Sequence, residues 1–213
     1  MENYYILMAD VVASRRHRGN TLSRDLKQLV ASCTTNLASG ILSPYTVTLG
    51  DEFQGVAKSL HSALESIFYF EETTLKENIR FKLRYVLHYG RIETRLNRKI
   101  AHGMMGTGLT RTRELLNQKR RGSPRFLFEL ANNMLSNQLN RLFRVFDSLI
   151  TGWREKDYLL ISDMLENDNN EEVGARHEKN RSQIWKRRKH LRIEEYKILK
   201  EVVFDLIKGK DLP

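Results

Sequence analysis

The chain has 213 residues, of which 40% are hydrophobic and 29% charged, and a formal net charge of +10. Apolar runs recur throughout, which argues against bulk disorder, and none approaches the roughly 20 residues that cross a bilayer. The single cysteine, Cys33, excludes an internal disulfide and a cysteine-based zinc site, and the N-terminus does not resemble a secretory signal, so we expect a cytoplasmic protein with no membrane partner.

Up to about residue 150, short apolar runs alternate with longer amphipathic segments. In chain order, the patterns predict a strand at 4–9, a helix at 22–37, hairpin strands at 45–49 and 53–57, a helix at 60–70, a strand at 81–89, a helix at 109–117, a strand at 126–128 and a helix at 131–150. Met134 is expected on the apolar side of the last of these helices.

After Gly152 the chain reads as helical, with helices expected at 153–165, 171–177, 181–191 and along 196–206. We therefore place a domain boundary near Thr151, between a domain at 1–150 and a smaller one at 151–213. The positive charge is concentrated: residues 91–125 contain ten Lys or Arg against two acids, and residues 176–192 contain eight against one. Such patches attract polyanions, although a solvated surface explains either patch alone equally well.

Two acidic residues stand where strands are predicted to end. Asp10 follows the first strand and Asp51 lies in the hairpin turn, so the carboxylates can approach each other if both strands are central in one sheet. Facing carboxylates repel unless a cation lies between them, and Mg²⁺ binds such oxygens together with nucleotide phosphates. The alternative is local turn chemistry, because Gly-Asp is a common turn pair. Spacing alone leaves both interpretations open.

Four motifs, in matching order over residues 4–118, resemble those of class III nucleotidyl cyclases. They are Ala9-Asp10-Val11-Val12, Leu49-Gly50-Asp51-Glu52-Phe53, Leu87-His88-Tyr89-Gly90-Arg91-Ile92 and the glycine-led helix from Gly106 to Leu115. The second also resembles the Gly-Asp-Glu-Phe signature of diguanylate cyclases. This resemblance implies Asp10 and Asp51 as ligands of Mg²⁺ or Mn²⁺, with Glu52 as a supporting neighbour. It also implies Arg113 as the catalytic residue that meets a triphosphate, since guanidinium binds phosphate oxygens in a bidentate manner.

The chain departs from the cyclase pattern on that helix. Cyclases carry an asparagine four residues before the arginine, where this chain has Leu109, or Thr107 if Arg111 is matched instead. A counterpart of the lysine that selects the base is also missing. The departure favours a domain that binds a nucleotide or a metal without turning the nucleotide over.

The whole chain is similar to the SatD family of bacterial proteins, through Ala9-Asp10-Val11-Val12-Ala13-Ser14-Arg15 and Leu49-Gly50-Asp51-Glu52-Phe53-Gln54-Gly55. The two resemblances imply an α+β fold: a ferredoxin-like, nucleotide-cyclase-like mixed sheet flanked by helices, followed by a small C-terminal helix-turn-helix domain. Cyclase sites form between two protomers, so a homodimer is implied as well.

Two basic segments are candidate binding sites. Ser14, Arg15 and Arg16 follow the first strand, where backbone amides and guanidinium groups can bind phosphate, and with Gly50 they make up the predicted phosphate-binding set. In the tail, Gly174 and Ile184 have the spacing of closely packed helices in a helix-turn-helix. Its second helix is expected to present outward the candidate DNA-binding residues Asn180, Arg181, Ser182, Gln183, Lys186 and Arg187.

These observations support two hypotheses. The first is a nucleotide- or metal-sensing regulatory protein with a degenerate cyclase-like domain and a DNA-binding tail, and we prefer it because the asparagine is missing. The second is an active metal-dependent nucleotidyl cyclase that uses Asp10 and Asp51. A third and weaker hypothesis is a structural partner of a membrane or signalling complex, for which a helical bundle in the tail would serve protein contacts.

Overall fold

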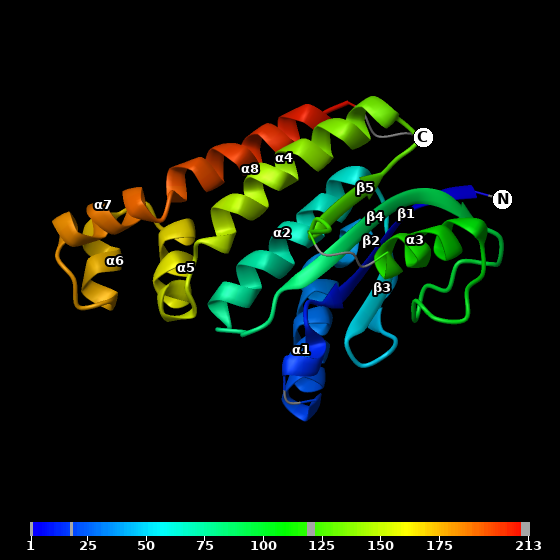
Figure 1. The fold of residues 1–213 in the computed structure, drawn as a ribbon, viewed down its shortest axis with the longest axis horizontal. Coiled ribbons are helices and arrows are strands. Elements are labelled where there is room, and N and C mark those ends of the chain that lie inside the picture. The colour runs from blue at the N-terminus through cyan, green and yellow to red at the C-terminus, as the bar shows by residue number, and fades with distance from the viewer. Residues whose placement is uncertain (1, 18, 119–121, 210–213) are drawn as a thin grey trace.

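The computed structural model describes residues 2–17, 19–118 and 122–209 (Figure 1). The strands are β1 (Glu2–Val11), β2 (Ile41–Val47), β3 (Glu52–Ala57), β4 (Leu83–Ile92) and β5 (Phe126–Glu129). The helices of the first part are α1 (Gly19–Asn36), α2 (Leu60–Lys76), α3 (Thr107–Asn117) and α4 (Asn133–Thr151). Those that follow are α5 (Tyr158–Glu166), α6 (Asn170–Arg176), α7 (Arg181–His190) and α8 (Ile193–Ile207). No helix in the described ranges combines the length and the apolar character that crossing a membrane requires.

The strands form one mixed sheet in the order β2-β3-β1-β4-β5. Strand β1 is central and antiparallel to both β3 and β4, whereas β5 joins β4 in parallel. The succession β1-α1-β2-β3-α2-β4 with this order is a ferredoxin-like arrangement, to which α3 and β5 are added. The expected mixed sheet flanked by helices, with a helical C-terminal region, is confirmed.

Both faces of the sheet are covered, and this explains the uninterrupted apolar run of β1. Tyr5, Leu7 and Ala9 belong to the large core under α1, α2 and α4. Alternate residues Ile6 and Met8 belong to a smaller cluster under α3. Side chains of a strand alternate between faces, so Asp10 lies on the α3 side of the sheet.

Helix α3 lies unusually close to β4 because two glycines face each other there. A Cβ atom added to Gly90 would lie 2.7 Å from the Cα of Gly108, and one added to Gly108 would lie 2.6 Å from the carbonyl carbon of Gly90. Real Cβ contacts are not that short, so the backbones can touch only because both positions lack a side chain. This contact fixes the position of the α3 side chains over the sheet.

The C-terminal helices pack back onto the first part of the chain. Helix α8 lies beside α4 (Figure 1), where the Tyr196 ring is 5.3 Å from that of Phe146 and 5.3 Å from that of Trp153. The indole N–H of Trp153 donates to the carbonyl oxygen of Leu191 at 2.9 Å. Buried residues before and after Thr151 share one core, and the domain boundary at this position stays a prediction.

Two local predictions are wrong. The helix expected from Trp153 begins as α5 only at Tyr158, after a short 3-10 turn at Glu155–Asp157, because the Trp153 side chain turns inward beside Tyr196. Met134 does not face the core but is 71% exposed in the first turn of α4. Helical periodicity does not reveal where along a helix its packing begins.

Candidate functional site

The two acidic segments of the sequence meet in the structure. Strands β1 and β3 are neighbours, and the backbone N–H of Val11 donates to the carbonyl oxygen of Asp51 at 2.9 Å. Within the sheet, Asp10 is directly opposite Glu52. Directly opposite residues project from the same face, so Glu52 is the cross-strand neighbour of Asp10, while Asp51 lies beside it at the hairpin turn.

The carboxylates of Asp10 and Glu52 are each bound by an arginine. Arg84 of β4 donates to Oδ2 of Asp10 at 2.6 Å, and Asp10 is only 2% exposed. Arg113 of α3 lies 3.5 Å from Oε2 of Glu52 and donates to Oε1 of Gln54 at 3.1 Å. Arg84, Asp10, Glu52 and Arg113 therefore form a row of charged side chains across β4, β1, β3 and α3. A buried carboxylate needs such a partner because burial without one is costly.

Arginines occupy part of the predicted metal site. Mg²⁺ requires carboxylate oxygens that are available as ligands, whereas Oδ2 of Asp10 and Oε2 of Glu52 already accept from guanidinium groups. The described residues also contain no group of three or more His, Cys, Asp or Glu side chains able to hold a metal ion.

A basic cavity of about 540 Å³ opens at the end of β1, and we call it the loop cavity. Its walls include Asp10 and Arg84, together with the predicted phosphate-binding residues Ser14, Arg15 and Arg16. The last three form a short 3-10 turn, in which Arg15 and Arg16 are exposed. Arg125 lines the cavity as well, so four guanidinium groups stand against one lining carboxylate. This excess of positive charge suits an anion such as a phosphate.

A second cavity, of about 910 Å³, lies beside α3, and we call it the helix cavity. Met8, Gln54 and Arg113 line it, with Leu109 and the backbone around Gly106. The charged row connects the two cavities, since Asp10 and Arg84 line the first and Arg113 lines the second. Within the described part of the chain, neither cavity is lined by Gly50, Asp51 or Glu52.

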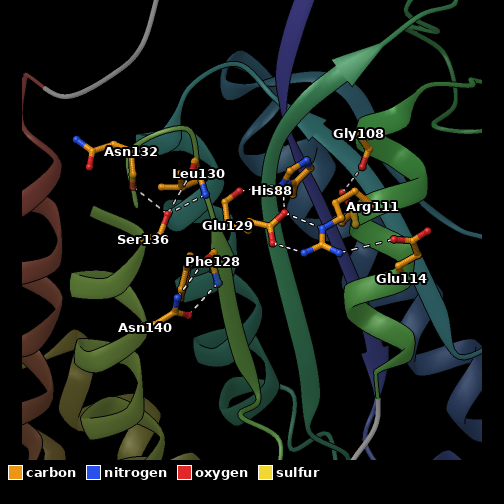
Figure 2. A network of polar contacts seen from close by, with 11 residues as sticks. His88, Gly108, Arg111, Glu114, Phe128, Glu129, Leu130, Asn132, Ser136 and Asn140 are labelled. Carbon is orange, nitrogen blue, oxygen red and sulfur yellow. Dashed lines mark hydrogen bonds and ion pairs between the residues drawn. The ribbon is translucent and has the colours of Figure 1, made fainter. Parts of the chain in front are cut away.

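Arg111, the other arginine considered for the cyclase match, points toward Glu129 (Figure 2). It forms a bidentate pair with Glu129 of β5 at 2.9 and 2.7 Å, beside His88 of β4. Hydrogen bonding from Arg111 lowers the pKa of Glu129, and burial lowers the pKa of His88, whose Nδ1 lies 2.9 Å from the Glu129 carbonyl oxygen. Arg113 is therefore the α3 arginine that reaches the site.

One residue of the charged row, Arg84, and one partner of the row, Gln54, were missed by the sequence analysis. Arg84 lies far from Asp10 in sequence, and only the register of β4 brings them together. Gln54 stands in the hairpin motif but received no role. The alternation of the strand at 81–89 was the available signal, because it placed Arg84 on the face opposite to its apolar neighbours.

Helices α6 and α7 pack against each other across a short connection, where the sequence predicts a helix-turn-helix. A Cβ atom on Gly174 would lie 2.4 Å from the carbonyl oxygen of Lys179 and 3.4 Å from Ile184, so a glycine is needed where the helices cross. Glu178, in the turn, has a φ of 53°, the left-handed conformation for which glycine is the usual residue. Asn180 caps α7, and its backbone N–H donates to Oε1 of Gln183 at 2.9 Å.

The start of α7 presents four of the candidate DNA-binding residues to solvent: Arg181, Ser182, Gln183 and Lys186. The expectation that Arg187 also points outward is wrong, because it is half-buried and paired with Asp157. The next residue, Arg188, is buried and donates to the carbonyl oxygens of Met164 and Asn167 at 2.7 and 2.8 Å. Trp185 is exposed beside Lys186 and does not belong to the core.

A model of the SatD family matches residues 4–207 of the chain. Among solved structures, one similar in arrangement is described as "Structure of a bacterial light-regulated adenylyl cyclase", with 14% sequence identity and a TM-score of 0.44. That alignment covers 60% of this chain and 75% of the other. A search of functionally curated proteins finds no match.

Proposed function

The chain belongs to the SatD family, and from the geometry of its site we propose that it is a regulatory protein that binds the phosphate groups of a nucleotide in the loop cavity and DNA through α7. The observation that carries the first half is the loop cavity itself, where Arg15, Arg16 and Arg84 surround the end of β1. Guanidinium groups recognise phosphate oxygens with paired hydrogen bonds, and this chemistry supports phosphate binding in the cavity.

The charged row supports binding without turnover. Arg84 and Arg113 already neutralise Asp10 and Glu52, so the carboxylates are held by the protein's own cations. A phosphate group that approaches the loop cavity competes with Asp10 for Arg84. We infer that a nucleotide changes the contacts of the row, which is what a sensor requires.

A direct binding measurement tests this proposal. ATP, GTP and inorganic triphosphate are titrated into the full chain by calorimetry, with and without Mg²⁺. We expect binding that the double substitution Arg15→Ser with Arg16→Ser weakens about tenfold or more, because two charge-assisted contacts to phosphate are lost. The control is Arg154→Ser, an exposed arginine outside both cavities.

Two outcomes decide the result. Binding that is lost in the double variant and kept in the control supports the loop cavity. Equal affinities in all three proteins, or no affinity for any of the three ligands, refute it.

The exposed start of α7 supports the second half of the proposal. In a helix-turn-helix the second helix enters the major groove and its first residues contact the bases. Arg181 and Lys186 provide positive charge on the exposed surface, whereas the capping bond to Gln183 already uses one acceptor position of its amide. We therefore assign DNA affinity chiefly to Arg181 and Lys186, with Ser182 and Gln183 as candidates for base contacts.

Salt dependence provides the test for DNA. Duplex DNA of mixed sequence is titrated by fluorescence anisotropy over a series of salt concentrations. Arg181→Glu with Lys186→Glu is expected to reduce the slope of log K against log salt by about 2, roughly one for each phosphate contact removed. Lys27→Glu, on the exposed side of α1, is the control. An unchanged slope in the α7 variant contradicts a DNA-binding role for this helix.

An active cyclase is the second candidate, and one observation favours it. The backbone hydrogen bond between Val11 and Asp51 brings Asp51 beside Asp10, the neighbour of Val11 in the chain. The cyclase resemblance requires these two acidic residues to be close together. We propose Mg²⁺ or Mn²⁺ as the cofactor only in this case, with Asp10 and Asp51 as ligands. Incubation with each nucleoside triphosphate and either ion, analysed by mass spectrometry, detects a cyclic product. Loss of that product in a folded Asp51→Asn variant supports this candidate, and the absence of any product refutes it.

A further inference from the structure

Helix α4 separates its charges by sign. It has three charged residues, of which Asp147 turns inward and pairs with Arg125 at 2.8 Å. Arg141 and Arg144 are exposed, and Val145 beside them is 56% exposed. We call Arg141, Arg144 and Val145 the basic face of α4. This face carries only positive charge, because Asp147, the only acidic residue of α4, pairs with Arg125 inside the protein.

Helix α8 shows the opposite separation. Its two lysines turn inward, Lys197 to Asp168 and Lys200 to Glu72. Its acids are exposed, together with Ile198 (56% exposed) and Val202 (42% exposed). We call this the acidic face of α8, made up of Glu194, Glu201, Asp205, Ile198 and Val202. In a chain of net charge +10, an outward surface with acids alone is unexpected.

The two helices that carry these faces lie next to each other. Helices α4 and α8 run antiparallel at the edge of the molecule, away from α1 and α3 (Figure 1). Because Phe146 contacts Tyr196, Arg141 lies at about the level of Glu201, and Arg144 at about the level of Ile198. Among the described residues, the charged members of the two faces have no ion-pair partner.

We propose that the basic face of α4 and the acidic face of α8 form the surface through which two copies of this chain associate. A two-fold axis that runs between the helices, parallel to both, places α4 of each copy on α8 of the other. Each basic face then meets the acidic face of the other copy, so this contact occurs twice per dimer, and Val145, Ile198 and Val202 become covered at the centre. A two-fold interface needs such a self-complementary patch, and a single-sign face does not provide one.

This dimer differs from the one that the cyclase resemblance implies, and it does not depend on the proposed function. The axis is parallel to α8, so both copies of α7 lie at the same end of the assembly. Helix-turn-helix proteins bind two half-sites with such a pair of helices.

A charge-swap experiment tests the interface. One variant carries Arg141→Glu and Arg144→Glu, and a second carries Glu201→Lys and Asp205→Lys. We expect the wild type to be a dimer in sedimentation equilibrium, and each variant alone to dimerise at least about tenfold more weakly, since like charges face each other across the interface. An equimolar mixture of the two variants restores the dimer, because both contacts of the heterodimer are again between opposite charges.

The mixture also excludes misfolding as the cause of a loss, because an unfolded chain cannot restore an interface. A control with the same change of charge, Arg24→Glu with Lys27→Glu on α1, stays dimeric. A wild type that is monomeric throughout the concentration series overturns the proposal. So does a dimer that both variants retain, or a mixture that fails to recover the association.

Discussion

The guanidinium of Arg84 lies 2.6 Å from the carboxylate of Asp10, at the end of the central strand β1, where both side chains are largely withdrawn from solvent. An acidic residue that sequence motifs mark as a metal ligand thus has a cation from its own chain. The protein neutralises the charge before any ligand arrives. Because Arg84 already balances the charge of Asp10, this site does not need a bound ion in order to fold.

Removing one partner of this pair should destabilise the protein strongly. In Arg84→Met we expect a loss of about 3 kcal/mol in the free energy of unfolding, because a buried carboxylate is left without its partner. Urea unfolding followed by circular dichroism measures the change. Adding Asp10→Asn to Arg84→Met should recover part of the loss. Arg80→Met, in an exposed pair with Glu155, serves as the control and should change stability by less than about 1 kcal/mol.

The close crossing of α6 and α7 predicts a sharp difference between two glycines. Gly174→Ala should cost about 1–3 kcal/mol, because its methyl group would lie 2.4 Å from a backbone oxygen. Gly152→Ala should leave stability unchanged or raise it slightly, since its nearest contact is 3.5 Å and its conformation suits any residue. Thermal unfolding of the two variants side by side checks this. Equal effects would show that α6 and α7 are not so closely packed.

The left-handed turn residue predicts a stabilising substitution. Glu178→Gly should raise the free energy of unfolding by about 1 kcal/mol, because glycine adopts a φ of 53° without the steric cost that a Cβ imposes. Glu178→Ala retains the Cβ atom and should bring no such gain. Urea unfolding distinguishes the two, and a gain in the alanine variant alone would contradict the explanation.

Burial of His88 predicts a pH-dependent stability. Its pKa in the folded protein lies below the ordinary 6.5, so the unfolded chain binds more protons in this range. Stability is therefore complete above that value and falls as the pH is lowered from about 7 through the folded pKa. The pKa of Glu129 is lowered too, and its contribution is lost in a separate, more acidic range.

Unfolding free energies measured in urea over a pH series check this expectation. His88→Asn should flatten the dependence below about pH 7, and His102→Asn, at an exposed position, is the control variant. If the dependence persists in His88→Asn, another group is responsible.

The sequence predicts the order of strands and helices well, because each signal is local. The unbroken apolar run before Asp10 indicates a strand covered on both faces, and β1 is indeed central. The hairpin around Asp51 follows from its turn residues. The family resemblance adds the meeting of these two segments, which periodicity alone leaves open.

What the sequence does not reveal depends on partners distant along the chain. Nothing near Arg84 indicates that it binds Asp10, since strand register decides it. Arg187 and Arg188 look like further surface charges of a basic helix, yet one pairs with Asp157 and the other is buried. The sequence of an arginine-rich helix gives the number of its charges, but not which arginines are buried or paired within the fold.

The joint between α7 and α8 has a mechanical consequence. Only Leu191 and Arg192 separate the two helices, and the carbonyl of Leu191 is held by the Trp153 indole, which packs on Tyr196. Because this connection is short and hydrogen-bonded, α7 cannot rotate independently of α8. The orientation of α7 relative to any binding partner is therefore fixed by the rest of the molecule. A change in this orientation requires α8 to tilt together with α7.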